Sequence, residues 1–424
     1  MTPWFALTLS LASAWAAAPA PDISTAVVPA PPSVAASTAS PAVSSAPALR
    51  LLAPEELPVF SDSFPAREPL VKAAKKSLAY LARQEGARYV RIGGRDYGAA
   101  ILADSIRELL DVLALAKSPE QLNALVRDRF DVFQSAGSDG QGKVVFSSYY
   151  QPILSASVQR SARYPVPIYR RPPDLVEADL SVFDKKYGSD VLIGRVTKGK
   201  RFVPYFSRED IDVRKTLRGK GYELAWLQNK FDVLDLHIQG SGILKFPSGK
   251  LKLARYAATN AQPYNSVATV LLKTGAMTRE EMTHQKVRDY FRSHPEAQDF
   301  VFARNPRYTF FELAPLPPDG EPSGTVQESL VAARSIAIDP SVIPLGALAF
   351  FTTVSPQADK DGGLLGQFSN SRFALCMDTG GAIKGPGRVD IYAGHGKMAE
   401  TTAKNQWNEG KLYILIKKIP ARER

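Results

Sequence analysis

The sequence predicts a mainly β protein with attached helices, organised as a pair of β-rich domains. After Gly142, short runs rich in Val, Ile, Tyr and Phe alternate with Gly, Pro and Lys, a texture typical of antiparallel strands. Helical periodicity is confined to the residues before Gly142 and to one middle stretch. With 424 residues, 45% of them hydrophobic, the chain is long enough for about two or three domains that each bury a core.

The N-terminus has the pattern of a secretory signal. In residues 1–20, an apolar run from Trp4 to Trp15 is followed by small residues, although no Lys or Arg precedes it. The alternative, an internal helix, would have nothing to pack against, because residues 21–54 are mainly Pro, Ala, Ser and Val and predict a disordered linker. We therefore expect export to the periplasm. No other run reaches the roughly 18 apolar residues that a membrane-spanning helix needs.

The net charge of +11 indicates an acidic partner, either nucleic acid or the carboxylate-rich peptidoglycan. Charge does not choose between them, but an exported chain rarely meets nucleic acid, so we expect none. Cys376 is the only cysteine, which excludes an intramolecular disulfide and a lipidated N-terminal cysteine. The four histidines lack metal-ligand spacing. We expect a monomer without metal or cofactor.

Three helices are predicted before Gly142, at 70–81, 101–115 and 121–130, where apolar residues recur at helical spacing. The third has the clearest start. Ser118 is an N-cap residue, Pro119 suits the first helical position, and Gln121 completes a capping box.

Blocks of strands and helices follow. Strands are predicted at 143–150, 166–169, 191–195 and 234–238. Helices are predicted at 254–272 and from Thr278, where Glu281 completes a capping box, to Pro295. The last strands are predicted at 347–354, 373–378, 388–393 and 411–419. The final strand places Leu412, Ile414 and Ile416 on one face and Tyr413 and Leu415 on the other.

The clearest candidates for catalytic residues are aspartates in or near the last group of predicted strands. Asp378 ends one predicted strand and is followed by Gly380 and Gly381, which let the backbone turn, while Asp390 lies in the next strand. If the glycine-rich stretch reverses the chain, the two acids lie close together, and Asp339 can join them. Neighbouring carboxylates raise one another's pKa, so that one can keep a proton near neutral pH. A glycosidic leaving group needs such an acid.

Each acid has a structural alternative. Asp339 precedes Pro340 and resembles a turn former, which we consider its main role. Asp378 can equally cap the glycine turn. Asp390 stands between Val389 and Ile391 in a β run, so its side chain points away from both and must be exposed, paired or functional.

Other motifs fail on their context. Asp378-Thr379-Gly380 matches an aspartic protease signature that requires a second copy, and the chain has none. Cys376 and His395 could form a thiol dyad, but 374–377 reads as a buried strand. The polar cluster at 237–242, with His237, Gln239 and Ser241, is either a β-turn or a wall of hydrogen-bonding groups for sugar hydroxyls.

These residues together resemble the membrane-bound lytic transglycosylase A family. The matching segments recur in family order from about residue 145 to the C-terminus. They are YYQP at 149–152, YPVPIYRRP at 164–172, SR at 207–208, HIQGSG at 237–242, Tyr256 with Asn260 and Pro263-Tyr264, NPRYTFF at 305–311, ARSIAID at 333–339, and 378–394.

The resemblance implies a double-psi β-barrel domain, formed by residues 55–150 and 276–424, with a second β-barrel inserted at 151–275 and a glycan groove between them. It implies that Asp339, Asp378 and Asp390 form a three-aspartate module in which Asp390 is the general acid and Asp378 supports it. It also implies a substrate-binding set, which we take as His237, Gln239, Ser241, Tyr150, Gly380, Gly381, Lys384 and Asp339.

The expected reaction is cleavage of peptidoglycan between N-acetylmuramic acid and N-acetylglucosamine, with formation of a 1,6-anhydromuramic end. A hydrolase that uses Asp390 and Asp378, and a non-catalytic wall-binding protein, are the alternatives. The chain departs from the family at Ala261, where Gly is common, and at Arg307, where Ser is usual. The missing lipidation cysteine puts outer-membrane anchoring in doubt, and peripheral contacts with that membrane or with wall proteins stay open.

Overall fold

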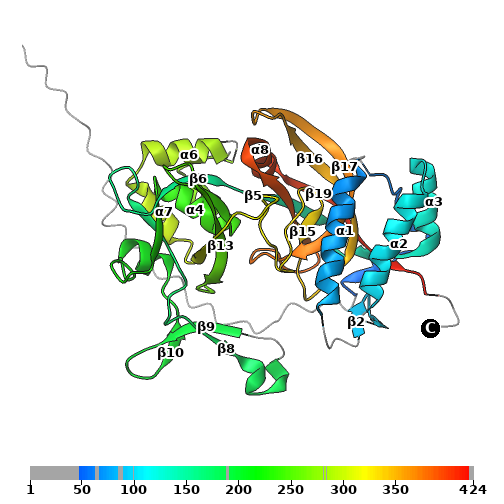
Figure 1. Cartoon of the computed structure of the whole chain (residues 1–424), viewed down its shortest axis with the longest axis horizontal. Helices are drawn as coiled ribbons and strands as arrows, with labels where there is room; N and C mark the ends of the chain where they lie inside the picture. Colours follow the sequence, from blue (N-terminus) through cyan, green and yellow to red (C-terminus); the bar gives the residue numbers. More distant parts are fainter. Residues whose placement is uncertain are drawn as a thin grey trace, which may run out of the picture. The chain divides into compact units, whose positions relative to one another are not determined.

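The computed structural model describes residues 47–62, 66–84, 89–98, 100–187, 191–279, 281–282 and 284–419. The expected signal segment and most of the expected linker lie outside these residues. The predicted fold class is confirmed: the chain is mainly β, with two barrels and attached helices (Figure 1). No helix in the described part of the chain is both long and apolar enough to span a membrane.

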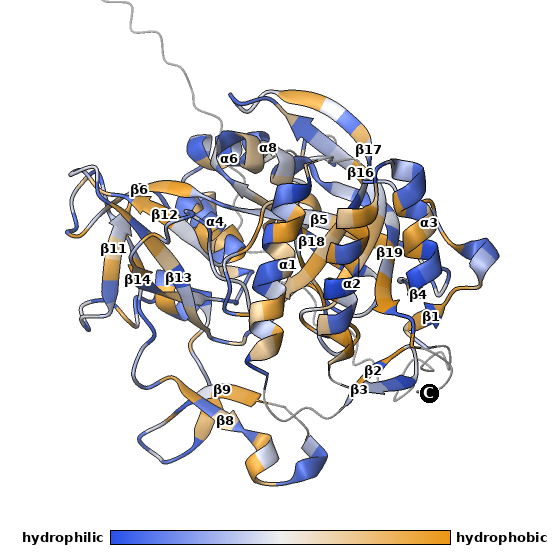
Figure 2. Ribbon diagram, turned by 45° about the vertical axis from the view of Figure 1, so that its right-hand side comes forward, coloured by the Kyte–Doolittle hydropathy of each residue, from blue (hydrophilic) through white to orange (hydrophobic). Residues whose placement is uncertain are grey.

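The three predicted N-terminal helices are present as α1 (Arg67–Ala82), α2 (Ile101–Leu115) and α3 (Pro119–Arg129). The Ser118 side chain caps α3 by accepting a 3.2 Å hydrogen bond from the Gln121 backbone. The Gln121 side chain accepts from the Lys117 backbone, one residue before the position that a capping box uses. The buried faces of these helices pack on the first barrel, where Figure 2 shows hydrophobic strands beside α1 and α2.

The first barrel is built from strands that are far apart in the sequence. The eight-stranded sheet has the order β1-β4-β19-β16-β17-β15-β18-β5, and the pairing of β19 with β5 closes a ring of six strands. The strands are β1 (Leu49–Leu51), β4 (Phe130–Ser135), β5 (Val144–Gln151), β15 (Ser335–Ala337), β16 (Leu348–Ala358), β17 (Leu364–Asp378), β18 (Arg388–His395) and β19 (Trp407–Lys417).

The alternation predicted for the last strand is confirmed in β19. Leu412, Ile414 and Ile416 pack in one core cluster, whereas Tyr413 and Leu415 pack in the other. Both faces of this strand are therefore buried, one inside the barrel and one against its helices. Helix α8 (Gly396–Asn405) follows β18 and packs on β5.

The expected disordered linker ends earlier than residue 54. Residues 49–51 form β1, which pairs antiparallel with β4, and Leu49 is buried. The sequence Leu49-Arg50-Leu51-Leu52 leaves the Pro/Ala/Ser composition, so it can bury apolar area that the tract before it cannot.

The inserted barrel has the strand order β14-β13-β12-β6-β11-β7, and a bridge between Arg170 and Phe311 joins its two edges. Its strands are β6 (Ile153–Ser157), β7 (Val166–Tyr169), β11 (Glu223–Leu227), β12 (Gly242–Lys245), β13 (Leu251–Thr259) and β14 (Thr309–Ala314). Because β14 pairs with β13, the insert continues well beyond the expected end at 275. A separate small sheet, β8 (Val176–Asp179), β9 (Val191–Val196) and β10 (Phe202–Pro204), branches from it (Figure 1).

The strand predicted at 234–238 is wrong. These residues belong to helix α4 (Lys230–Gln239), which Asn229 caps by accepting a 2.8 Å hydrogen bond from the Asp232 backbone. Phe231 and Leu234 pack against one core cluster and Val233 and Leu236 against another. A short helix buried on two faces has a nearly continuous apolar pattern, which periodicity cannot distinguish from a strand.

The helix predicted at 254–272 is wrong in its first half, which forms β13, and correct in its second half, α5 (Val267–Lys273). The Thr278 backbone donates a 3.0 Å hydrogen bond to Glu281 as predicted, but the helix before Pro295, α6 (His284–Ser293), begins later. Helix α7 (Ala297–Ala303) follows. The remaining elements are η1 (Pro54–Glu56), β2 (Tyr89–Ile92), β3 (Arg95–Gly98), η2 (Leu180–Val182), η3 (Lys185–Tyr187) and the π-helix η4 (Glu209–Val213).

Candidate active site

A groove between the two barrels contains the carboxyl group of Asp390. Val389 and Ile391 are buried in the barrel core, so the alternation of β18 directs Asp390 to the opposite side. The cavity there is lined by residues of both barrels, including Asp390 and Asp378 from the first and Gln239, Tyr256 and Arg307 from the insert. Asp390 thus lies where a polymer between the barrels would pass.

The contacts of Asp390 come from the neighbouring strand β5. The parallel pairing of β5 with β18 places Ser147 opposite Asp390, and the Ser147 hydroxyl donates a 2.8 Å hydrogen bond to Asp390 Oδ1. Ser147 in turn accepts a 2.9 Å bond from Arg388 Nη2. The Arg388 guanidinium lies 4.4 Å from the centre of the Trp407 ring. Arg388 therefore orients the serine so that its proton points at the aspartate.

Burial raises the pKa of Asp390 to about 6, and the nearby charge of Asp378 acts in the same direction. The Ser147 hydrogen bond and the charge of Arg388 oppose this rise. Asp390 therefore holds a proton in mildly acidic solution. No described residue donates a hydrogen bond to its second oxygen, Oδ2, which leaves that atom for a substrate.

Asp378, at the end of β17, is held as a hydrogen-bond acceptor. Its Oδ2 accepts a 2.7 Å bond from the Tyr149 hydroxyl, and its Oδ1 accepts three 2.9 Å bonds, from the Thr325 backbone, the Thr325 hydroxyl and the Thr379 backbone. Burial raises the pKa of Asp378 above its usual value, and these bonds offset part of that rise. Both oxygens are occupied, so Asp378 is suited to present a negative charge beside Asp390 and poorly suited to transfer a proton.

Asp339 does not line the groove. Its carboxylate accepts bonds from the Gly385 backbone at 2.7 Å and from Ser341 at 2.8 and 3.0 Å. Burial would raise the pKa of Asp339, but these bonds and the charge of Lys384 lower it. Asp339 anchors the turn that carries the glycines, as expected for an aspartate before a proline, and the side chain of Lys384 is exposed outside the groove.

The inserted barrel supplies the polar cluster at the C-terminal end of α4. Gln239, Gly240 and Ser241 line the groove. Gln239 Oε1 accepts a 3.1 Å bond from the Tyr150 backbone, and its Nε2 donates a 3.2 Å bond to Asp235. Gln239 thus links the insert to β5 of the first barrel.

His237 also borders the groove, but its ring is buried and lies 4.3 Å from the Tyr308 ring and 5.5 Å from the Phe311 ring. Its ring nitrogens have no hydrogen-bond partner in the described part of the chain, and burial lowers the pKa of His237 well below its usual value. The imidazole is therefore neutral. It is not a proton carrier at neutral pH.

Tyr150 and Tyr149 occupy opposite faces of β5. The Tyr150 ring is buried away from the groove and its hydroxyl donates a 2.7 Å bond to Asp235, whereas Tyr149 lines the groove and contacts Asp378. The tyrosine predicted from the sequence as a substrate contact was Tyr150, whereas Tyr149 and Ser147 were not predicted. The period of two along β5, which puts Ser147 and Tyr149 on one face, was the available signal.

Gly380 and Gly381 lie at the groove, and Gly381 is in close contact with Arg307 from the other barrel. A Cβ atom at Gly381 would lie 2.9 Å from the Arg307 guanidinium carbon, so the glycine lets this cation approach the turn. The second departure from the family pattern, Ala261, has a φ of 53°, a left-handed conformation that favours glycine.

Comparison with known proteins agrees with this arrangement. Residues 145–312 match the MltA specific insert domain, and residues 334–416 match the 3D domain. The membrane-bound lytic murein transglycosylase A of Escherichia coli K12 is 31% identical over 287 residues, which cover 67% of this chain and 69% of the relative.

Solved structures extend the similarity over most of the chain. A membrane-bound lytic murein transglycosylase from Agrobacterium tumefaciens has a TM-score of 0.68 and 28% identity, covering 89% of this chain and 99% of that one. E. coli MltA with bound chitohexaose has a TM-score of 0.66 at 23% identity, covering 88% and 96%, and shows the same fold.

The two barrels, the aspartate pair in the groove and these similarities define the class of protein, a lytic murein transglycosylase. The chain belongs to the membrane-bound lytic murein transglycosylase A family. The family resemblance predicted from the sequence is thereby confirmed.

Proposed function

We propose that this chain cleaves the β-1,4 bond between N-acetylmuramic acid and N-acetylglucosamine in peptidoglycan, and closes the muramic acid on itself as a 1,6-anhydro sugar. The observation that carries the proposal is Asp390: a partly buried carboxyl in a groove, with a pKa of about 6 and one oxygen without a protein donor. Such a group can give a proton to the glycosidic oxygen and take one back.

The reaction is balanced without added water. Asp390 donates its proton to the bridging oxygen as the bond to C1 of the muramic acid breaks, and the N-acetylglucosamine leaves with a free hydroxyl. The C6 hydroxyl of the same muramic acid then attacks C1, and the Asp390 carboxylate removes its proton. Because the nucleophile is tethered, its effective concentration can reach about 10⁵ to 10⁸ M. One aspartate thus serves as acid and then as base.

Asp378 supports this reaction as a fixed charge. Positive charge develops on C1 as the bond breaks. A carboxylate that four donors hold in place would stabilise that charge without reorganisation. The same bonds disfavour the hydrolytic alternative, because a saturated Asp378 is a poor base for activating water.

The occupant of the groove is proposed to be a glycan strand. One relative's structure is described as MltA with bound chitohexaose, which supports a polysaccharide ligand. The N-terminal signal pattern and the family's membrane-bound members support export to the periplasm and peripheral contacts with the outer membrane. Gln239, Ser241, Gly380 and Gly381 are the proposed groove contacts.

The test is mass spectrometry of soluble products released from purified sacculi. The expected products carry anhydromuramic ends, and Asp390→Asn is expected to release none while still unfolding cooperatively. Products one water heavier would establish the hydrolase instead. Binding of sacculi by the wild type without any release would establish the wall-binding protein.

A further inference from the structure

A second cavity lies within the inserted barrel and shares no lining residue with the groove. Its walls come from β7, β11, the π-helix η4, the first turn of α4 and α7. Lys230, the first residue of α4, lines this cavity, whereas Gln239, the last residue, lines the groove. The two sites are thus at opposite ends of one helix, about 14 Å apart along its axis.

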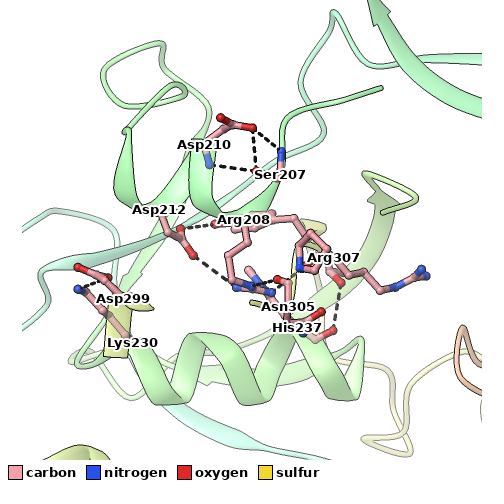
Figure 3. A network of polar contacts seen from close by, with 12 residues as sticks. Ser207, Arg208, Asp210, Asp212, Lys230, His237, Asp299, Asn305 and Arg307 are labelled. Carbon is pink, nitrogen blue, oxygen red and sulfur yellow. Dashed lines mark hydrogen bonds and ion pairs between the residues drawn. The ribbon is translucent and has the colours of Figure 1, made fainter. Parts of the chain in front are cut away.

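One wall of the cavity is a fixed polar network, drawn in Figure 3. Arg208, only 2% exposed, donates to the backbone carbonyls of Asn305 at 3.1 Å and Arg307 at 2.7 Å, and to Asp212 at 3.4 Å. Asp212 also accepts a 3.2 Å bond from the Tyr308 hydroxyl. In the figure the side chain of Arg307 points away from this network. The buried Arg208 is paired with the partly exposed Asp212 and bonded to two carbonyls, so its side chain is held in place.

A hydrogen-bond donor that is open to the cavity has no protein partner. Tyr169 is 2% exposed and lines the cavity, and none of the described residues hydrogen-bonds to its hydroxyl. Burial raises the pKa of Tyr169 above its usual value, the charges of Glu223 and Asp212 act in the same direction, and the charge of Arg218 opposes them. The hydroxyl therefore keeps its proton and remains a donor. An acceptor oxygen of a ligand in the cavity can accept a hydrogen bond from this hydroxyl.

The charges of the cavity favour an anion. Five cationic and two acidic side chains line it. The acids, Asp212 and Asp299, are paired with Arg208 and Lys230. Neither Arg160, which lies over the Trp226 ring, nor Arg218 forms an ion pair with an acidic side chain in the described part of the chain. A single anionic group near Tyr169 and Arg218 would therefore be attracted and hydrogen-bonded.

The rest of the cavity lining is mainly apolar. Val166, Pro167, Trp226 and Phe302 contribute to it. The cavity has a volume of about 190 Å³, which leaves room for small apolar groups. Its ligand should therefore combine a carboxylate with small apolar groups.

The backbone around the cavity is unusual. The wall segment Glu209–Val213 is a π-helix, a rare form that is frequent at functional sites. Lys215, which follows it, lines the cavity and has a φ of 58°, a strained value for a residue with a side chain. Such strain persists where the surrounding structure requires a particular shape.

We propose that this cavity binds the terminal carboxylate of a murein peptide stem, with Tyr169 and Arg218 contacting the carboxylate and Trp226 and Phe302 contacting the alanine methyl groups. The proposal rests on the proposed function, which makes murein the substrate. An extended five-residue stem spans about 17 Å, comparable to the distance between the two sites along α4. The stem of a glycan in the groove, or that of a neighbouring strand, can supply the ligand.

The binding test uses the whole exported chain with Asp390→Asn, so that turnover plays no part. A synthetic five-residue stem peptide ending in alanyl-alanine is titrated by calorimetry, alongside the same peptide with a C-terminal amide. The free acid is expected to bind, and the amide at least about tenfold more weakly, because it loses the charge-assisted bonds. No binding of the acid, or equal binding of both peptides, would overturn the proposal.

Variants locate the site. Arg218→Gln and Tyr169→Phe are each expected to weaken binding of the free-acid peptide by about tenfold. Neither change should disturb folding, because the Arg218 side chain is exposed and Tyr169→Phe removes only a hydroxyl without a protein partner. Arg214→Gln is the matched control, because Arg214 is an exposed arginine nearby that pairs with Glu209 and Asp210 and does not line the cavity. Equal loss in all three variants would indicate general charge attraction and refute the site.

A second measurement separates this proposal from the proposed function. Wild type and Arg218→Gln, both with Asp390 intact, are compared on sacculi and on the same glycan after its peptides have been removed. Arg218→Gln is expected to lower the ratio of release on stem-bearing to stem-free glycan several-fold. An unchanged ratio would refute the stem site while the anhydro products still stand. Absence of anhydro products with intact peptide binding would refute only the cleavage reaction.

Discussion

Ser147 and Asp390 are separated by 243 positions in the chain, yet the parallel pairing of β5 and β18 sets them opposite one another, joined by a 2.8 Å hydrogen bond. This bond works against burial, which raises the pKa of Asp390. The pKa of Asp390 therefore depends on the pairing of two strands, β5 and β18. In the sequence, the first precedes the inserted barrel and the second follows it.

The pH dependence of cleavage should report the proton on Asp390. Since the acid must start protonated, kcat/KM is expected to fall about tenfold per pH unit above pH 6. Ser147→Ala removes a bond that lowers the pKa of Asp390, so the falling limb should move to higher pH. Ser148→Ala is the control, because its hydroxyl bonds to the Ile391 carbonyl and not to the acid. A limb that stays in place in Ser147→Ala would contradict this role.

Asp390→Asn should stabilise the fold at high pH while abolishing activity. The folded-state pKa is raised, so the unfolded state loses its proton first, and ionisation costs stability as pH rises through about 6. At pH 8 the variant is expected to gain about 2 kcal/mol in the free energy of unfolding, and at pH 4 almost nothing. Denaturant unfolding at the two pH values measures this. A variant that is less stable at pH 8 would show that Asp390 is structural.

Asp339→Asn should have the opposite effect on stability. Hydrogen bonds and Lys384 lower the pKa of Asp339, so its contribution is present above the unfolded pKa and disappears as pH falls through the folded one. We expect a loss of about 2 kcal/mol at pH 7 that vanishes in acid, once the folded-state carboxyl is protonated. Urea titrations across this range provide the measurement. If the loss of stability is the same at neutral pH and in acid, packing and not charge is responsible.

Tyr149→Phe and Tyr150→Phe should separate chemistry from stability. The first removes a donor to Asp378 in the groove and is expected to lower kcat about tenfold with little change in unfolding. The second removes one of the hydrogen bonds to the buried Asp235 and is expected to cost about 1 to 3 kcal/mol of stability, with kcat preserved at low temperature. The reverse pattern would reassign the two tyrosines. Single-turnover kinetics and thermal unfolding, run in parallel, distinguish the outcomes.

Ala261→Gly should stabilise the protein. Ala261 has a φ of 53°, where an alanine is strained and a glycine is not. The gain is expected to be about 0.5 to 1 kcal/mol, because the flexibility of glycine in the unfolded chain offsets part of the relief. Ala258→Gly, in the strand β13, is the control and should destabilise. Calorimetric unfolding of both variants checks the prediction.

Much of the site was predictable from local sequence. An aspartate between two apolar strand residues can only point away from the core, and Asp390 does so. The turn-forming role of Asp339 followed from the proline after it. Helix α4 was wrongly predicted as a strand. It is buried on two sides, so its sequence lacks the regularly spaced polar residues that indicate a helix.

The sequence by itself determined the alternation of the β strands, the carboxyl chemistry, the export signal pattern and the family. Only the tertiary structure decided which donors each carboxylate meets: Ser147 for Asp390, and Tyr149 with Thr325 for Asp378. The direction of a side chain is a local property of its strand. The partner of that side chain depends on how distant strands pair and on how much water their packing excludes, and these determine whether an aspartate is a proton donor or a fixed charge.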